Sequence, residues 1–185
     1  HPPGPHHGAA GREVSGMEHL PKRLGLRLPR HDYSHPGGYF VTICTKDRSH
    51  CLASAFVGHD DLGVPQMELT EIGRMVEKWI NSIPAAYPNV ILEQYVVMPN
   101  HVHLFLRIAG SEVGAPGSSR PTQLLPRVIA ALKRFTNREA GQSLWQTSYY
   151  DHVIRSEADA FRVREYMENN PARWQEDRYY TADLP

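Results

Sequence analysis

The sequence predicts one α+β domain built on an antiparallel sheet. Three observations lead to this class: several runs of β-branched and aromatic residues are typical of strands, three segments repeat apolar residues every three or four positions as helices do, and the two kinds alternate along the chain. At 185 residues with 41% hydrophobic content, the chain can form a single core. We expect residues 17–185 to form this domain, and residues 1–16, rich in Pro, Gly and His, to be a disordered or artificial tail.

The strands are predicted from composition and from the breakers beside them. Residues 39–45 are β-branched and aromatic and follow a Pro-Gly-Gly breaker, so they predict the first strand. Residues 90–98 and 101–108 predict two more, which should pair as an antiparallel hairpin because only a Pro-Asn turn separates them. Residues 144–154 are a fourth candidate, and residues 46–69 are expected to be irregular.

The helices are predicted from apolar periodicity and from capping residues. Thr70 can cap a helix that ends before Pro84, and Thr122 can cap a second helix after a Gly-, Ser- and Pro-rich loop. Ser156, with an acidic residue three positions later, predicts the start of a last helix that ends at Pro171. The resulting order, strand, helix, strand, strand, helix, strand and one added helix, is the ferredoxin-like βαββαβ pattern with helices on one face of the sheet and an extra C-terminal helix.

The composition of the chain indicates the cellular location of the protein and the kinds of partner to expect. No apolar run is long enough to cross a bilayer and no secretory signal is recognisable, so we expect a soluble cytoplasmic protein without a membrane partner. The two cysteines have no metal-finger spacing, and Cys44 is expected to be a buried thiol.

The formal net charge is zero, with 20 basic and 20 acidic residues, but the charges are unevenly distributed. Residues 120–138 contain five basic residues and no acidic one, and residues 22–30 hold a second basic cluster. Such clusters can follow a phosphate backbone, but they are equally typical of a solvated helix or tail surface.

His101 and His103 lie two residues apart in the predicted second strand of the hairpin. Side chains at this spacing project from the same face of a strand, roughly 6.7 Å apart, and could converge on one metal ion. Alternatively, they are two ordinary histidines on the exposed edge of the sheet. A histidine-triad hydrolase would need a third histidine two residues later, where Phe105 stands instead.

Tyr166 and Asn170 are four residues apart on the last helix and therefore share a face. The pair could carry chemistry, but Tyr166 could also be a core aromatic and Asn170 a helix cap.

Four separated motifs show that most of the chain, from about residue 22 to residue 178, resembles the bacterial REP-associated tyrosine transposases, members of the HUH single-tyrosine transposase group. The motifs are His31-Asp32-Tyr33-Ser34 with residues 38–45, Val97-Met98-Pro99-Asn100-His101-Val102-His103, Leu144-Trp145-Gln146 with residues 149–155, and Tyr166 with Asn169-Asn170-Pro171. The resemblance implies a ferredoxin-like fold, a cytoplasmic, nucleoid-associated protein, and either a monomer or a homodimer.

The resemblance also implies roles for the candidate residues. His101 and His103 would be metal ligands, Asn170 would complete the metal shell, and Tyr166 would be the nucleophile. With Mg²⁺ or Mn²⁺ bound, such a site would cut single-stranded DNA next to a hairpin of a repetitive extragenic palindrome, leaving a 5′-phosphotyrosine and a 3′-hydroxyl that allow strand transfer.

Contacts with DNA would need positive charge for phosphates and aromatic faces for unpaired bases. The candidates for phosphate contacts are Arg127, Lys133, Arg134, Arg138 and Arg155. Trp145, with Tyr149 and Tyr150, could stack on bases or pack in the core. By resemblance, the segment with Lys22, Arg23, Arg27 and Arg30 would contact the DNA that flanks the hairpin.

Two other functions fit the same residues. A protein that binds DNA hairpins without cutting them would need no nucleophile, and a metal-dependent phosphodiesterase would use water in place of Tyr166. His152 is a candidate general base, although a structural histidine is the better explanation of this residue.

Overall fold

The computed structural model describes residues 37–57, 65–109 and 124–182. The predicted tail, the basic cluster at Lys22, Arg23, Arg27 and Arg30, and the predicted cap at Thr122 lie outside these residues.

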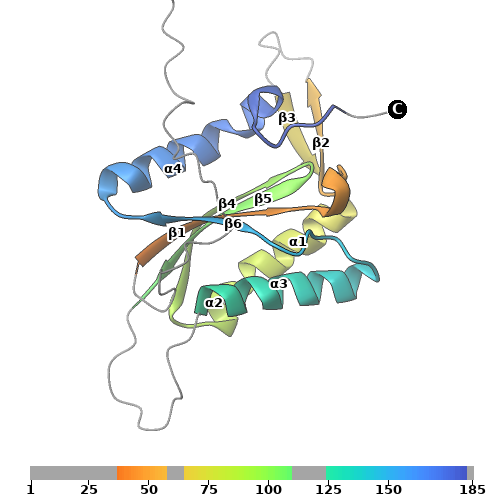
Figure 1. Ribbon diagram of the computed structural model, residues 1–185. Coiled ribbons are helices and arrows are strands. Elements are labelled where there is room, and N and C mark those ends of the chain that lie inside the picture. Colours follow the sequence, from red (N-terminus) through yellow and green to blue (C-terminus); the bar gives the residue numbers. More distant parts are fainter. Residues whose placement is uncertain (1–36, 58–64, 110–123, 183–185) are drawn as a thin grey trace, which may run out of the picture.

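A four-stranded antiparallel sheet forms the centre of the fold (Figure 1). Its strands are β1 (Gly37–Cys44), β4 (Val90–Met98), β5 (His101–Ile108) and β6 (Tyr150–Ile154), in the order β4-β5-β1-β6. Each neighbouring pair is antiparallel. This order confirms the predicted ferredoxin-like arrangement, and it places β5 and β1 in the middle of the sheet.

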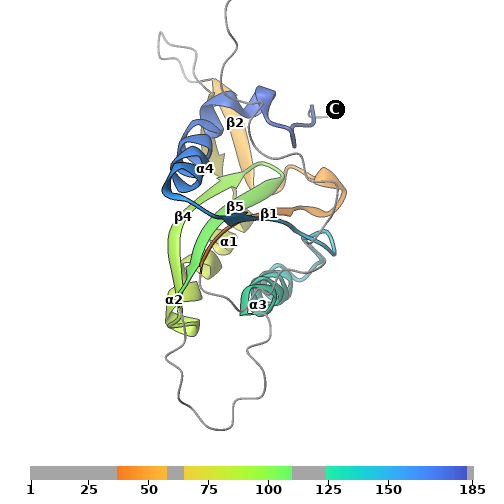
Figure 2. The same cartoon turned by 60° about the vertical axis from the view of Figure 1, so that its left-hand side comes forward.

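Helices cover both faces of the sheet (Figures 1 and 2). The helices α1 (Glu71–Asn81) and α3 (Leu124–Ala140) lie on one face, and α4 (Glu157–Asn169) lies on the other. The short α2 (Ile83–Ala86) follows α1, and the 3-10 helix η2 (Pro171–Glu176) follows α4. The added C-terminal helix therefore covers the face that the two helices of the βαββαβ unit leave open.

Residues alternate between these two layers along the central strands, because successive side chains of a strand point to opposite faces. Tyr39, Val41 and Ile43 of β1 join the larger core under α1 and α3. Phe40 of β1 and Phe105 of β5 join a smaller core under α4. Burial on both faces explains why these strands contain few charged residues.

Local capping chemistry sets the start of α1 and α4 as predicted. The Thr70 hydroxyl accepts a hydrogen bond from the backbone N–H of Gly73, and the Ser156 hydroxyl accepts one from Asp159. A Cβ atom at Gly73 would lie 1.9 Å from the carbonyl oxygen of Leu52, so this position needs glycine to let α1 approach the chain.

Two predictions about the strands need correction. The segment 46–69 is not irregular throughout: it contains the 3-10 helix η1 (Lys46–Arg48) and a separate antiparallel pair, β2 (Ala53–Val57) and β3 (Pro65–Leu69). The fourth strand of the main sheet begins at Tyr150, and residues 144–149 contribute only a bridge between Trp145 and Thr45. Both segments lack sustained alternation of polar and apolar residues, so contacts between distant parts of the chain decide their structure.

Candidate active site

His101 and His103 are completely buried on the central strand β5. They face the layer of α4, because Val102 between them belongs to the core under α1 and α3. The alternative of two histidines on an exposed sheet edge is therefore wrong.

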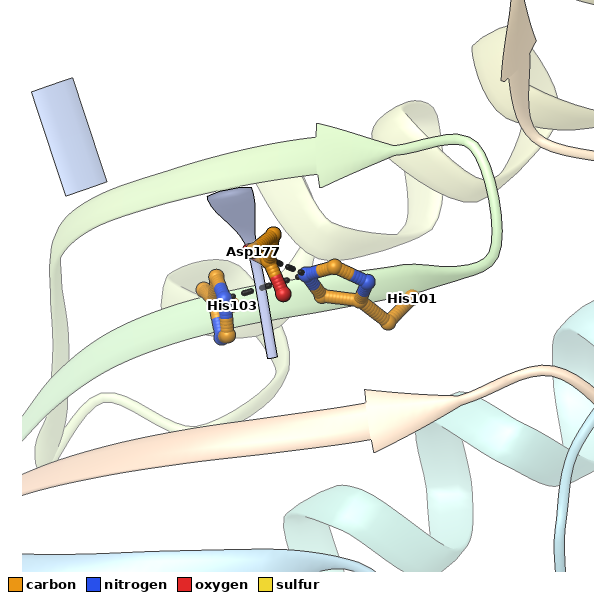
Figure 3. A group of neighbouring side chains, drawn as sticks. All are labelled: His101, His103 and Asp177. Atoms are coloured by element: carbon orange, nitrogen blue, oxygen red, sulfur yellow. Dashed lines mark hydrogen bonds and ion pairs between the residues drawn. The ribbon is translucent and has the colours of Figure 1, made fainter. Parts of the chain in front are cut away.

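The two imidazoles contact each other, with the two Nε2 atoms 3.0 Å apart (Figure 3). Each Nδ1 atom has its own polar partner: that of His103 lies 2.8 Å from Thr42 Oγ1, and that of His101 lies 2.8 Å from Asn100 Oδ1. Such partners on the outer nitrogen orient a metal-binding histidine.

Asn100 determines which nitrogen of His101 carries the proton. Its Nδ2 atom donates to the backbone carbonyl of Tyr179, so its Oδ1 atom faces His101 and accepts. His101 Nδ1 is consequently the donor, and the lone pair on Nε2 points to His103 and into the site.

Asp177 is the third member of this cluster. Its Oδ2 atom lies 3.7 Å from His101 Nε2, and one ligand atom from each of His101, His103 and Asp177 lies within 4.8 Å of the others (Figure 3). The buried group of two histidines and one carboxylate can hold a metal ion. The sequence prediction missed Asp177, because one acidic residue after η2 has no periodic or spacing signal that sets it apart.

Tyr166 on α4 lies next to this cluster. Its hydroxyl donates to Asp177 Oδ2 over 3.4 Å, and its ring centroid lies 5.4 Å from that of His103. Its neighbours Val163 and Met167 are buried in the core under α4, which fixes the side of the helix that Tyr166 occupies. The fold therefore brings Tyr166 to the two histidines.

Asn170 is buried at the C-terminal cap of α4. It is close enough to Asp177 to favour the charged carboxylate, yet among the described residues its Nδ2 atom has no hydrogen bond of standard geometry. Asn170 thus combines the helix-cap position with a place beside the cluster of His101, His103 and Asp177.

Burial determines the protonation of the site. It lowers the pKa of His103 to about 3, with a smaller contribution from the positive charge of Arg178, and it lowers the pKa of His101 well below its ordinary value. Burial and the nearby Asp177 carboxylate raise the pKa of Tyr166, and burial raises the pKa of Asp177. The histidines are therefore neutral, as metal ligands must be, and the phenol keeps its proton.

The predicted DNA-contact residues on α3 fall into two groups. Arg127, Arg134 and Arg138 are exposed, on the face of the sheet opposite the histidines (Figure 2). Lys133 instead donates to the carbonyl oxygens of residues 146, 147 and 148 and so supports the loop before β6.

The other candidates lie around β6. Arg155 is exposed just before α4. Trp145 is buried, and its indole N–H donates to Thr136, so the structure shows the core-packing alternative for this residue. His152 lies 2.8 Å from Asp159 of α4, and this contact favours its structural role.

Comparisons with known proteins agree with the fold and the motifs. No family model matches the chain. An uncharacterized protein of Haemophilus influenzae is 30% identical over 182 residues, covering 90% of this chain and 96% of that protein. A protein of the same organism named "Putative REP-associated tyrosine transposase" is 22% identical over 156 residues, covering 78% of this chain and 75% of that protein.

A solved structure of a REP-associated tyrosine transposase bound to a REP hairpin has the same fold, with a TM-score of 0.55 and 18% identity, covering 75% of this chain and 68% of that chain. The chain thus has the fold of a REP-associated tyrosine transposase, and its sequence motifs resemble those of that family. The chain matches the 30%-identical uncharacterized Haemophilus influenzae protein over almost the whole length of that protein. In the part of the chain that the structure describes, no helix is long and apolar enough to span a membrane.

Proposed function

We propose that this protein is a metal-dependent DNA endonuclease and strand transferase that acts on single-stranded DNA beside a hairpin. The observation that carries the proposal is the position of the Tyr166 hydroxyl, 3.4 Å from a carboxylate that itself belongs to a buried His-His-Asp cluster. A nucleophile beside a metal-binding group is the arrangement that tyrosine-mediated phosphoryl transfer requires.

The donor set fits a divalent metal ion. His101 and His103 offer neutral imidazole nitrogens, and Asp177 and Asn170 place a carboxylate and an amide beside them. Mixed nitrogen and oxygen donors suit Mn²⁺, and Mg²⁺ would rely more on the oxygens. When bound, the ion would supply Lewis-acid stabilisation of the negative charge on the scissile phosphate.

Tyr166 supplies the bond-forming oxygen in this proposal. The phenol oxygen attacks the phosphorus, the bond from phosphorus to the 3′-oxygen breaks, and the proton lost by the phenol is balanced by the proton that the 3′-hydroxyl gains. The product is a 5′-phosphotyrosine, and attack by another 3′-hydroxyl reverses the step and joins a new strand. The phosphodiester bond energy is kept in the covalent link, so strand transfer needs no further energy source.

Hairpin DNA is the proposed substrate because the solved structure with the same fold is described as bound to a REP hairpin. Exposed Arg155 at the start of α4 is the proposed phosphate contact on the side of Tyr166, and Arg127, Arg134 and Arg138 form a second basic surface on α3. Because the sheet separates these two surfaces, we propose that they contact different parts of the DNA.

The test is to incubate the protein with Mn²⁺ and an end-labelled hairpin oligonucleotide, taken from palindromic repeats near its gene, and to separate the products on a denaturing gel. We expect a covalent protein–DNA band that disappears in Tyr166→Phe, while this variant still binds the hairpin. Tyr95→Phe is the matched control, since Tyr95 also donates to a carboxylate, that of Glu77, but away from the site.

A covalent band that persists in Tyr166→Phe would exclude Tyr166 as nucleophile. Cleavage without any covalent band would instead favour hydrolysis by water, and tight binding without cleavage would favour a protein that only recognises hairpins.

A further inference from the structure

We propose that Asp177 couples the metal site to the nucleophile, because one of its carboxylate oxygens serves both the histidine cluster and the Tyr166 hydroxyl. The proposal rests on the proposed function and adds a positioning residue to it, one that the sequence motifs do not contain.

The contacts of the Asp177 carboxylate divide between its two oxygens. Oδ1 accepts the backbone N–H of Tyr179 over 2.6 Å, which fixes the carboxylate to the chain after η2. Oδ2 lies 3.4 Å from the Tyr166 hydroxyl and 3.7 Å from His101 Nε2. The Asp177 side chain has no exposed surface, so water does not replace either contact.

The distances are those expected if a metal ion and the Tyr166 hydroxyl compete for Oδ2 of Asp177. Ligands of Mn²⁺ or Mg²⁺ at about 2.1 Å from the ion lie about 3 Å apart when they are adjacent. The two imidazole Nε2 atoms already have this separation at 3.0 Å, whereas Oδ2 lies 3.7 Å from His101 Nε2 and would move closer to it to serve as an adjacent octahedral ligand. The bond from Tyr166 is already longer than an ordinary O–H···O bond, and it would weaken further as the ion draws charge from Oδ2.

This geometry predicts that the Tyr166 phenol and a metal ion compete for Asp177 Oδ2, so that each weakens the binding of the other. Removing the hydroxyl takes away the hydrogen bond of standard geometry that Tyr166 makes to Asp177 Oδ2 and leaves, among the described residues, only the nearby Asn170 amide, and a buried acceptor that loses a donor is costly. An ion then relieves a larger penalty and binds more tightly. Binding free energies are reciprocal, so the hydrogen bond between Asp177 and Tyr166 would weaken by the same amount with an ion bound, and the Tyr166 hydroxyl would be freer to attack.

A double-mutant cycle on Mn²⁺ affinity tests this coupling, with free Mn²⁺ measured by electron paramagnetic resonance and no DNA present. We expect Tyr166→Phe to bind Mn²⁺ about three- to tenfold more tightly than the unmodified protein. Asp177→Asn keeps the shape and the acceptor for Tyr179, and it should weaken binding at least about tenfold. In the Asp177→Asn background, Tyr166→Phe should have no further effect. Tyr95→Phe and Asp159→Asn, which alter a phenol and a carboxylate elsewhere, should leave the affinity unchanged.

Unchanged or weaker Mn²⁺ binding in Tyr166→Phe would overturn the coupling, and so would equal effects of Tyr166→Phe with and without Asp177→Asn. Both results would leave the metal site itself intact. Failure of the proposed function looks different: the unmodified protein would not bind Mn²⁺, or binding would survive replacement of both His101 and His103 by Ala. Because Tyr166→Phe changes only one partly buried atom, its result decides the coupling even if Asp177→Asn folds poorly.

Discussion

The side chain of Asn100 binds the backbone carbonyl of Tyr179, 2.9 Å away and 79 residues later in the chain. This bond ties the turn between β4 and β5 to the segment that carries Asp177. The same side chain fixes the proton on His101, so one residue aligns two members of the candidate metal site.

Asn100→Ala should therefore weaken the metal site and the fold together. We expect Mn²⁺ affinity to fall by about 10- to 100-fold, because the hydrogen bond that orients His101 is lost. Unfolding free energy should fall by about 1–3 kcal/mol, since the Tyr179 carbonyl loses its donor. Asn169→Ala, which removes an exposed amide bound to Glu165, should change neither quantity in calorimetric titration and urea unfolding.

Tyr179 covers the two histidines, with ring centroids 4.8 Å from His101 and 5.9 Å from His103. Tyr179→Ala should open the site and cost about 3 kcal/mol of stability, as expected for a buried aromatic residue. Diethyl pyrocarbonate should then modify His101 and His103 faster, as mass spectrometry of digested protein would reveal. Tyr180→Ala is the control, since Tyr180 is 39% exposed; equal rates in both variants would contradict the covering role.

Stability should depend on pH through the buried histidines. Burial lowers the pKa of His103 to about 3, while in the unfolded chain it stays near 6.5. Below pH 6.5 the unfolded chain therefore binds a proton that the folded protein excludes, so the stability present above pH 6.5 is lost as pH falls. The loss is about 1.4 kcal/mol per pH unit for such a histidine.

Urea unfolding in chelator between pH 7.5 and 5.5 measures this loss, which centres on pH 6.5 and should total about 1.4 kcal/mol over the whole window; His103→Gln should lose less stability over the window by about that total. The raised pKa of Asp177 acts in the opposite direction, because the folded protein then binds the proton more readily. This contribution is common to both proteins and cancels in the comparison. Identical losses would mean that His103 is not held neutral by burial.

Substitutions in the two groups of basic residues on α3 should have different effects, one on hairpin binding and the other on stability. Arg134→Ala with Arg138→Ala should weaken hairpin binding and reduce its salt dependence by about one unit of slope per lost phosphate contact, with only a small loss of stability from the guanidinium contacts over the Phe135 ring. Lys133→Ala should instead destabilise the protein, because three carbonyl oxygens lose their donor. Fluorescence anisotropy at several salt concentrations and thermal unfolding distinguish the two; hairpin affinity unaffected by the arginine changes would remove α3 from the interface.

Local chemistry made much of the fold predictable. The hairpin strands β4 and β5 have the bounds predicted from sequence, because β-branched residues and the Pro-Asn turn favour the same conformation locally. Thr70 and Ser156 mark helix starts for the same reason, since each hydroxyl binds a backbone N–H three residues later. The pair β2 and β3 has no such signal, as its stability comes from cross-strand contacts between weak strand formers.

The sequence by itself determined the order of the elements that form the main sheet and its helices, the alternation of β5 side chains between the two faces, and the spacing that places His101 and His103 on one face. These features depend on neighbours within a few positions along the chain. Only the tertiary structure decided that α4 covers the opposite face from α1 and α3, that Trp145 packs in the core, and that Asp177 joins the histidines and Tyr166. The physical reason is that a single polar side chain in an irregular segment leaves no periodic pattern, and its partners are set by the docking of α4 and η2 on the sheet.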